Sequence, residues 1–414
     1  MKSSHYKWLA VGLLWVVWML NYLDRQVIFS IFPLLQKELT LSNLQLGLLG
    51  TSFLWIYAAF SPFCGYLSDR YGPKLLVVAS LLVWSLVTLA TAHARSFTDL
   101  LWARAAMGIS EACYLPAGLA LVAAYHSERT RSKATGLHQS GSYAGTILGG
   151  LAGGWIGQSY GWRSVFVLLG AAGVIYTLVV ALGIRKPRSF AAPLAVQEKL
   201  EMRSTLRELF SLRGFGMMTL AFGAVSVGDW AVYTWMPVYM YERFHMSLAQ
   251  AGFSATFYLK GGGLLGLLLG GALADWWSCR TSRGRLHCQS LGLIGAAPFL
   301  FFSGFTDSSL LLVIALAVYG FGKGMYDANV MPVLCQVARP GVRSTGYGVF
   351  NMTGCVAGGA VAAIAGALKN SFGLGGTIQV AGILLGCAGL ALLCIRMNPA
   401  TAQISAAPAF ASSD

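Results

Sequence analysis

The chain has 414 residues, of which 56% are hydrophobic and 11% are charged, and its formal net charge is +14. Soluble domains carry about 25% charged residues, so this composition excludes an ordinary soluble protein and indicates a polytopic membrane protein. The positive charge would suggest nucleic acid in a soluble protein, but here the basic residues fall in alternate loops, and we expect no nucleic-acid partner.

Hydrophobic runs recur along the whole chain at lengths that can cross a bilayer, which takes about 20 residues in a helix. We count twelve such runs and therefore expect an all-α membrane protein embedded in a lipid bilayer. Their approximate bounds are 8–33, 44–67, 75–93, 98–125, 134–157, 163–184, 214–240, 250–274, 288–305, 309–337, 344–366 and 375–396.

The basic residues are distributed unevenly between the two sides of these spans. If the N-terminus is cytoplasmic, 20 of the 29 Lys and Arg residues fall on the cytoplasmic side. This asymmetry follows the positive-inside rule. We expect a multi-pass protein of the plasma (inner) membrane with both termini in the cytoplasm. The basic residues assigned to the outside are Lys37, Arg95, Arg163, Arg243 and Lys369.

The first span, 8–33, is polar in its middle, where it carries Asn21, Tyr22, Asp24 and Arg25. Charged side chains at mid-membrane depth are costly, so they usually face a bundle interior or an aqueous cavity and mark an ion or substrate path. We interpret this stretch as the centre of a transport site. The span is too long and too polar for a cleaved signal peptide, and we expect it to remain as an anchor.

The fourth span carries a second charged pair. Arg104 and Glu111 are seven residues apart, so they share one helical face about 10 Å apart along the axis. With Asp24 and Arg25 they make two acids and two bases in one half of the chain. Buried ion pairs could simply lock helices together, but we favour a functional interpretation because four ionisable groups in two spans exceed what packing needs.

Two sequence echoes indicate that the chain is a duplicated six-span unit. Gly-Tyr-Leu-Ser-Asp-Arg-Tyr-Gly-Pro-Lys at 65–74 follows the second span, and Gly-Ala-Leu-Ala-Asp at 271–275 follows the eighth. Glu-Ala-Cys-Tyr-Leu-Pro at 111–116 matches Asp-Ala-Asn-Val-Met-Pro at 327–332. The predicted parts are an N-terminal bundle (1–190), a cytoplasmic linker (191–213), a C-terminal bundle (214–397) and a cytoplasmic tail (398–414).

The segment between the halves is basic and contains a helix-like run over 194–210. Leu200, Leu206 and Phe210 could form its apolar side, which would make it an amphipathic helix at the inner membrane face. A solvated linker is the alternative.

All eight cysteines lie in or beside spans, without CxxC spacing or a paired extracellular framework. We therefore expect neither a disulfide nor a metal site. No Gly-x4-Gly-Lys-Ser/Thr run is present, so ATP hydrolysis is not supported and energy must come from an ion gradient. No cofactor is expected.

The loop that follows the second span resembles the signature of the major facilitator superfamily, and the shorter copy ending at Asp275 fits its second half. The resemblance covers essentially the whole chain and implies two six-helix bundles rocking about a central site. The loop would hold the inner gate, where Asp69 can pair with basic groups and glycines permit close backbone approach. Its signature residues are Gly65, Asp69, Arg70, Gly72 and Lys74.

The charged residues resemble a particular branch of that superfamily, the anion:cation symporters, which include sugar-acid and sialic acid carriers. The resemblance implies proton-coupling acids at Asp24 and Glu111. We expect the substrate to be bound by Tyr22, Arg25, Tyr57, Arg104, Gln139 and Asn351. Spinster-type lipid carriers resemble the chain at the same Asp-Arg and Glu positions, so a lipid-like amphiphile is the alternative substrate.

The coupling we expect is electrostatic. When a substrate carboxylate takes Arg25, Asp24 loses its basic partner and favours protonation, so the anion and the proton travel together. In the second half, Asp327 could pair with Lys323 one turn earlier, and we favour that structural role for it. Lys260 departs from the family pattern and adds positive charge. Other polar candidates are Asp229, Trp230, Tyr233, Tyr258 and Asn329.

The fifth span carries a glycine series that indicates close helix packing. Drug antiporters of the superfamily usually insert a proline in that series, where this chain has Thr146-Ile-Leu, which favours uptake by symport over export. No nucleophile, base and metal set indicates an enzyme, and no large output domain indicates a sensor. We predict a monomeric secondary active transporter that imports a small organic anion, such as a sugar acid, with a proton.

Overall fold

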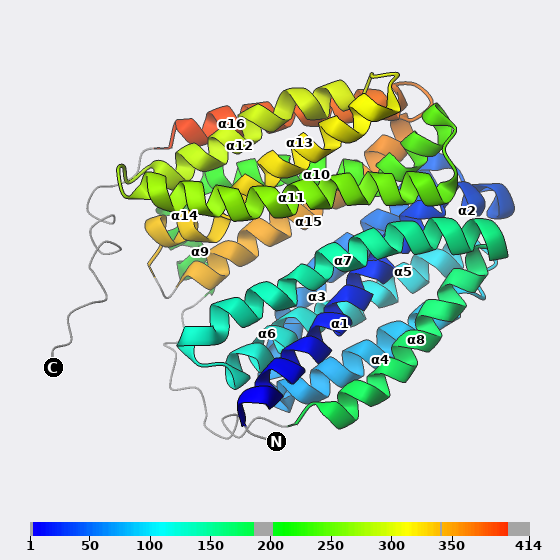
Figure 1. The fold of residues 1–414 in the computed structure, drawn as a ribbon, viewed down its shortest axis with the longest axis horizontal. Helices are drawn as coiled ribbons and strands as arrows, with labels where there is room; N and C mark the ends of the chain where they lie inside the picture. Colours follow the sequence, from blue (N-terminus) through cyan, green and yellow to red (C-terminus); the bar gives the residue numbers. More distant parts are fainter. Residues whose placement is uncertain (1–2, 186–201, 340–341, 396–414) are drawn as a thin grey trace. The chain divides into compact units, whose positions relative to one another are not determined.

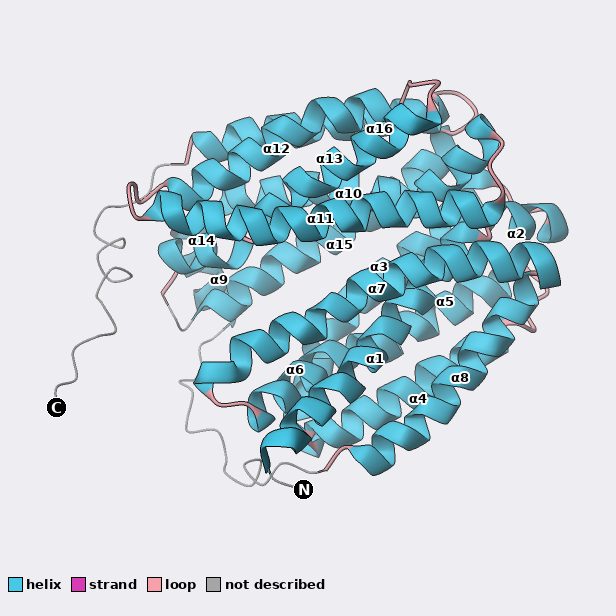
Figure 2. Ribbon diagram, viewed as in Figure 1, coloured by secondary structure: helices cyan, strands magenta, loops and turns pink. Residues whose placement is uncertain are grey.

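The computed structural model describes residues 3–185, 202–339 and 342–395, and within these ranges the chain forms helices and no strand (Figure 2). The helices (Figure 1) are α1 (Ser3–Ser30), α2 (Phe32–Leu39), α3 (Asn43–Tyr71), α4 (Pro73–Thr91), α5 (Phe97–Ala112), α6 (Tyr114–Tyr125), α7 (Glu128–Tyr160), α8 (Trp162–Gly183), α9 (Met202–Ser211), α10 (Phe215–Phe244), α11 (Leu248–Ser278), α12 (Gly284–Ser303), α13 (Ser309–Asp327), α14 (Val330–Val337), α15 (Arg343–Leu368) and α16 (Gly373–Leu393).

Eleven helical segments among the described residues are long and apolar enough to cross a membrane. Two of them are broken helices, with α5 and α6 forming Phe97–Tyr125 and α13 and α14 forming Ser309–Val337. The predicted span at 134–157 lies inside α7, which is 33 residues long but rich in glycine and polar residues. The all-α membrane fold is confirmed, and eleven rather than twelve helical segments of the described residues are long and apolar enough to cross a membrane.

The two broken spans break where the sequence repeats. α5 ends one residue after Glu111, and α13 ends at Asp327. Pro116 and Pro332 lie shortly beyond these ends. A proline has no N–H to donate to the carbonyl four residues earlier, so the helix loses a bond at that point. The matching breaks agree with the predicted duplication.

The chain divides into two compact units. Unit 1 comprises Met1–Ala195, Trp230–Phe257 and Gly358–Leu374, and unit 2 comprises Val196–Asp229, Tyr258–Ala357 and Gly375–Asp414. The helices α10, α11, α15 and α16 therefore contribute residues to both units. The predicted domain bounds stay a prediction, and part of the linker and the whole tail lie outside the described residues.

In unit 1, α1 lies along α7 and α4 lies along α8 (Figure 1). A Cβ added at Gly145 would collide with the backbone carbonyl of Met19 on α1, and one at Gly150 would collide with the carbonyl of Gly252 on α11. The predicted close packing of this glycine series is confirmed. The glycines of α7 that face α1 are Gly141, Gly145, Gly149 and Gly153.

Aromatic residues bury the middle of α1 against its neighbours in unit 1. Trp18, Trp84 and Tyr114 are 3% exposed or less. The Tyr114 hydroxyl donates to the Leu14 carbonyl at 2.7 Å and lies 2.9 Å from Nε2 of His138. A buried polar side chain needs such partners, and here they fix the rotation of α1 that aims its charged residues.

The described part of the linker forms α9, which is held in unit 2. Thr205 and Leu209 are its buried residues. The predicted apolar side is different: Leu200 lies outside the described residues, Leu206 is half-buried, and Phe210 is 56% exposed. The face of α9 that packs on unit 2 is therefore not the face that the sequence pattern indicated.

The expectation that no disulfide forms is wrong. Cys64 of α3 and Cys113, at the break between α5 and α6, are disulfide-bonded, with their Cα atoms 4.5 Å apart. The two residues are separated by 49 positions, so no local spacing motif signals the pair. Packing of α3 against α5 brings them together.

Candidate transport site

The two charged residues of α1 point to different neighbours, because successive residues of an α-helix are about 100° apart around the axis. Nε of Arg25 donates to Oε2 of Glu111 on α5 at 2.5 Å. The Asp24 carboxylate instead accepts a hydrogen bond from the Thr88 hydroxyl of α4 at 3.4 Å. The expected pairing of Asp24 with Arg25 is therefore wrong, and the partner of Arg25 is Glu111.

The Arg25–Glu111 pair is buried and incompletely hydrogen-bonded. The side chains are 6% and 0% exposed. Nη2 of Arg25 and Oε1 of Glu111 are buried without a hydrogen-bond partner among the described residues. A guanidinium has five N–H donors, and buried charges need their donors and acceptors matched. The pair therefore has one hydrogen-bond donor, on Arg25, and one acceptor, on Glu111, without a partner among the described residues. This arrangement suits a cation that can exchange one carboxylate for another.

Aromatic rings surround the Arg25 guanidinium. Its Cζ lies 4.8 Å from the ring centre of Tyr57, 5.0 Å from that of Tyr22 and 4.9 Å from that of Phe53. Cation–π attraction acts within about 6 Å of a ring centre. These rings hold the guanidinium in place without neutralising it, so it keeps its charge available for an anion. The structure thus brings Tyr22 and Tyr57 to Arg25, as predicted.

Phe53 was missed by the sequence analysis. It lies four residues before Tyr57 on α3, so the two share one face of the helix. That spacing was the available signal, but Phe53 offers no polar group to single it out from other apolar residues. In the structure its ring also lies 4.5 Å from Cζ of Arg104, so one ring contacts both buried guanidinium groups.

Arg104 is close to the pair without touching it. Its Nε donates to the Leu49 carbonyl at 3.3 Å, and Nη1 lies 3.1 Å from Sδ of Met107. It interacts electrostatically with Glu111 and Asp24. Arg104 therefore adds positive potential to the two acids while its hydrogen bonds go to α3 and to its own helix.

The remaining two predicted substrate residues lie on different helices, Gln139 on α7 in unit 1 and Asn351 on α15 in unit 2. Gln139 is exposed on α7, and its carbonyl accepts from Ser142 at 2.7 Å. Asn351 is half-buried on the unit 2 part of α15, where its Oδ1 lies 4.0 Å from Sγ of Cys355. Within the described contacts of unit 1, the Gln139 side chain does not reach Arg25.

The predicted inner-gate loop joins α3 to α4 at Gly72. Its φ is +86°, a conformation that favours glycine. Nη1 of Arg70 lies 3.3 Å from the Tyr66 hydroxyl, and Lys74 is half-buried. The Asp69 side chain lies outside the part of the chain that the structure describes.

The second copy of the gate motif shows the kind of pairing predicted for the first. Asp275, near the end of α11, accepts from Nη2 of Arg285 on α12 at 2.7 Å. The aspartate of the motif therefore fixes the connection between α11 and α12 in unit 2.

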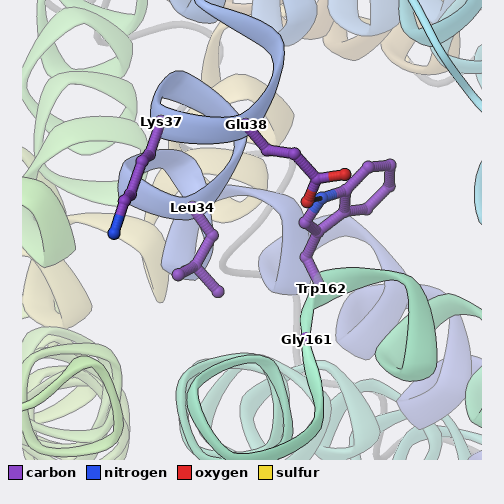
Figure 3. Close-up of a pocket in the computed structure, with 5 residues that line it drawn as sticks. All are labelled: Leu34, Lys37, Glu38, Gly161 and Trp162. Carbon is purple, nitrogen blue, oxygen red and sulfur yellow. Dashed lines mark hydrogen bonds between the residues drawn. The ribbon is translucent and has the colours of Figure 1, made fainter.

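A separate pocket of about 330 Å³ lies beside α2 and the start of α8 (Figure 3). Its carboxylate is already engaged: Glu38 accepts from the Trp162 indole at 2.6 Å and pairs with Arg163. Figure 3 shows the Glu38 carboxylate beside that indole, with Lys37 directed away. We assign no substrate to this pocket.

The comparisons place the chain in a family. The model for the Major Facilitator Superfamily matches residues 14–363. The chain belongs to the Major Facilitator Superfamily. Among its relatives is the probable galactarate/D-glucarate transporter GudP of Bacillus subtilis (strain 168), 26% identical over 401 residues, covering 90% of this chain and 88% of the relative.

Another relative is the probable sulfoacetate transporter SauU of Cupriavidus necator, 26% identical over 417 residues, which cover 95% of this chain and 94% of SauU. The solved structure of a bacterial homologue of the human lysosomal transporter Spinster, inward-facing and unoccupied, has a TM-score of 0.79 at 20% identity, covering 95% of this chain and 99% of that one. This likeness shows the fold.

These findings confirm the predicted superfamily and the class of protein. The chain is a multi-pass membrane transporter and not an enzyme, and several of its relatives are named as probable transporters of sugar acids or of sulfoacetate.

Proposed function

We propose that the protein imports a small organic anion, such as a sugar acid, together with a proton across the inner membrane. The observation that carries this proposal is the buried Arg25–Glu111 pair, which joins a permanent cation to a carboxylate that can take up a proton. The transporters of galactarate, D-glucarate and sulfoacetate among the relatives support an anionic substrate.

The coupling of anion binding at Arg25 to proton binding at Glu111 follows from charge balance in a buried site. A substrate carboxylate that binds Arg25 displaces Glu111, and a displaced, buried carboxylate without its cation is costly while ionised. Glu111 therefore binds a proton as the anion arrives, and the net charge of the site is unchanged. Arg25 binds the anion, Glu111 couples it to the proton, and Tyr22 and Tyr57 shape the site.

Asp24 is the second proton-coupling acid in this proposal. It interacts electrostatically with Glu111 and with Arg104, and it accepts from Thr88 inside the N-terminal helices. A proton bound to one of two neighbouring carboxylates makes proton binding to the other less favourable, so the two acids titrate as a coupled pair. Asp24 thus receives or supplies the proton that Glu111 binds and releases.

We further propose that transport proceeds by alternating access. Carriers built from repeats move one bundle against the other around a fixed site. The positive-φ glycine at Gly72 and the Asp275–Arg285 pair lie at the corresponding connections of the two repeats. Both termini lie in the cytoplasm in this scheme, and the protein works as a monomer.

The test is uptake into proteoliposomes under an imposed pH gradient, with sugar acids, neutral sugars and a fluorescent lipid as candidate substrates. We expect accumulation of a sugar acid that collapses when the gradient is removed. Asp24→Asn should abolish accumulation but leave exchange of substrate for substrate. Glu242→Gln, which removes the ion pair between Glu242 and Lys369, serves as the matched control and should transport normally.

Two outcomes would overturn the proposal. Accumulation of neutral sugars alone would contradict the role of Arg25. Export of lipid without uptake of any acid would favour the spinster-like alternative.

A further inference from the structure

Two arginines of unit 2 stand apart from its ion pairs. Nζ of Lys323 on α13 lies 2.5 Å from Oδ2 of Asp327, which confirms that predicted pair, and 3.7 Å from Oδ1 of Asp229 on α10. Arg203 and Arg207 of α9, in contrast, are exposed and make no ion pair or hydrogen bond with any described residue. Their guanidinium groups are therefore available to an anion from outside the chain.

The two arginines share one face of α9 with an aromatic residue. Successive helical residues are about 100° apart, so positions 203, 207 and 210 fall within about 60° of one another around the axis. Phe210 is 56% exposed, whereas Thr205 and Leu209 are buried on the opposite side of the helix. α9 therefore has an inner face packed on unit 2 and an outer face formed by Arg203, Arg207 and Phe210.

No carboxylate of α9 neutralises this outer face. Glu208 is the one acidic residue between Met202 and Ser211. It is already bound by Arg339, whose Nε and Nη2 donate to its two carboxylate oxygens at 2.6 and 2.8 Å. The outer face of α9 therefore carries two positive charges beside an apolar ring.

The neighbours of α9 place it at the ends of two membrane spans of unit 2. Three residues separate its last residue, Ser211, from the first residue of α10, Phe215, and the rings of Phe210 and Phe215 are 5.3 Å apart. A Cβ added at Gly346, in the first turn of α15, would lie 3.3 Å from a methyl carbon of Leu209. Because α10 and α15 are both candidate spans that begin here, α9 lies at the level where they leave the bilayer. The distribution of basic residues predicts that this side is cytoplasmic.

We propose that the outer face of α9 binds anionic phospholipids of the cytoplasmic leaflet. Arg203 and Arg207 bind phosphate oxygens of the headgroups, and the Phe210 ring lies against the first carbons of the acyl chains. Charge complementarity identifies this partner, because the cytoplasmic leaflet is negatively charged and attracts basic residues at its surface. Arginine matches the geometry of phosphate, and a helix with cations and an aromatic ring on one face suits the boundary between headgroups and acyl chains.

Binding of lipid to α9 should stabilise unit 2. A ligand that binds only the folded state raises its stability. Since α9 packs on the first turns of α10 and α15, its lipid-bound form is linked to the folding of those spans. The inference does not depend on which substrate is transported, so it is tested separately from the proposed function.

The experiment measures the thermal unfolding midpoint of the purified full chain in neutral detergent, with increasing amounts of phosphatidylglycerol or phosphatidylcholine. Phosphatidylglycerol should raise the wild-type midpoint more than phosphatidylcholine does, and added salt should weaken the difference. Arg203→Gln or Arg207→Gln should raise the phosphatidylglycerol concentration for half of the effect about fivefold, and both together about thirtyfold. Lysine at both positions should preserve most of the effect, because the charge is kept.

Arg280→Gln is the matched control. It removes one positive charge from an exposed position in the connection between α11 and α12, on the side that is also predicted to be cytoplasmic. This variant should respond to phosphatidylglycerol as the wild type does.

Hydrogen–deuterium exchange of the full chain in lipid nanodiscs locates the effect on α9. The backbone amides of α9 should exchange more slowly in discs that contain phosphatidylglycerol than in discs of phosphatidylcholine alone. The double variant Arg203→Gln/Arg207→Gln should remove that difference. Both arginines are exposed, so we expect the variant to fold.

Three outcomes would overturn the inference. The first is an equal response to phosphatidylglycerol in the wild type and the double variant, and the second is an equal loss in Arg280→Gln. The third is protection of α9 by a soluble hexaglutamate peptide but not by phosphatidylglycerol, which would assign the outer face to an acidic protein instead. Each of these outcomes would leave the proposed uptake of an organic anion intact.

Discussion

Replacing Glu111 by glutamine separates the two roles assigned to it, as a competitor for Arg25 and as the group that binds the coupled proton. Glutamine resembles the protonated glutamate in shape and charge. In the wild-type protein the anion must displace an ionised Glu111 from a contact of 2.5 Å. In Glu111→Gln no carboxylate competes, so the anion should bind without proton uptake.

The ion pair between Arg25 and Glu111 determines how much stability Glu111→Gln should lose. Two unit charges about 4 Å apart attract by about 4 kcal/mol at an effective dielectric constant of 20. Removing one partner of a buried pair destabilises a protein by roughly 3–5 kcal/mol. Glu111→Gln without ligand should therefore unfold at a lower temperature than the wild type. Bound anion should restore more stability to the variant than to the wild type, since it supplies the missing negative charge to Arg25.

The assay is anion affinity as a function of pH, measured by calorimetry or by thermal shift on purified protein. If one proton binds with each anion, wild-type affinity falls by about tenfold per pH unit above the range where Glu111 is protonated. The affinity of Glu111→Gln should be nearly independent of pH, and proton-driven accumulation should be lost. A variant that kept the wild-type pH dependence would refute the exchange of Glu111 for substrate.

Three further substitutions test the fold around the site, each by the thermal unfolding midpoint of purified protein. Gly145→Ala should destabilise by about 1–3 kcal/mol because its Cβ collides with the carbonyl of α1, whereas Gly136→Ala on the same helix meets nothing within 4 Å and should not. Gly72→Ala should cost about 1–3 kcal/mol, because φ is +86° and ψ is 141° there, a combination that side chains other than glycine rarely adopt. The hydrogen bond from Arg339 lowers the pKa of Glu208. The pair therefore stabilises the fold at pH values above the ordinary pKa range of glutamate, and this stabilisation is lost as the pH falls. Glu208→Gln should lower the unfolding midpoint at pH 7 but not near pH 3.

The fold was predictable because its signals are carried by composition and by repetition. The span pattern, the glycine series and the echo of 111–116 at 327–332 each appear in the structure as helices, close helix contacts and matched breaks. Charged residues in apolar spans likewise marked Arg25 and Glu111, since few other causes place them there.

The pairing within the site could not be predicted, because it depends on how each helix is rotated against its neighbours. Asp24 and Arg25 are adjacent in the sequence, but the side chains of adjacent helical residues point in different directions. The Arg25 side chain forms its ion pair with Glu111. Phe53 carries no charge and so gave no signal. The link between Asp229 and Lys323 joins two helices far apart in the chain and became visible only once they were packed together.

The central claim, that an organic anion and a proton move together, is tested most directly by internal pH. Proteoliposomes containing the protein and a trapped pH-sensitive dye, without an imposed gradient, would receive a sugar acid from outside. The account predicts acidification of the interior that depends on the sugar acid, is absent with a neutral sugar and is lost in Asp24→Asn. Uptake of the anion with no change in internal pH would contradict it.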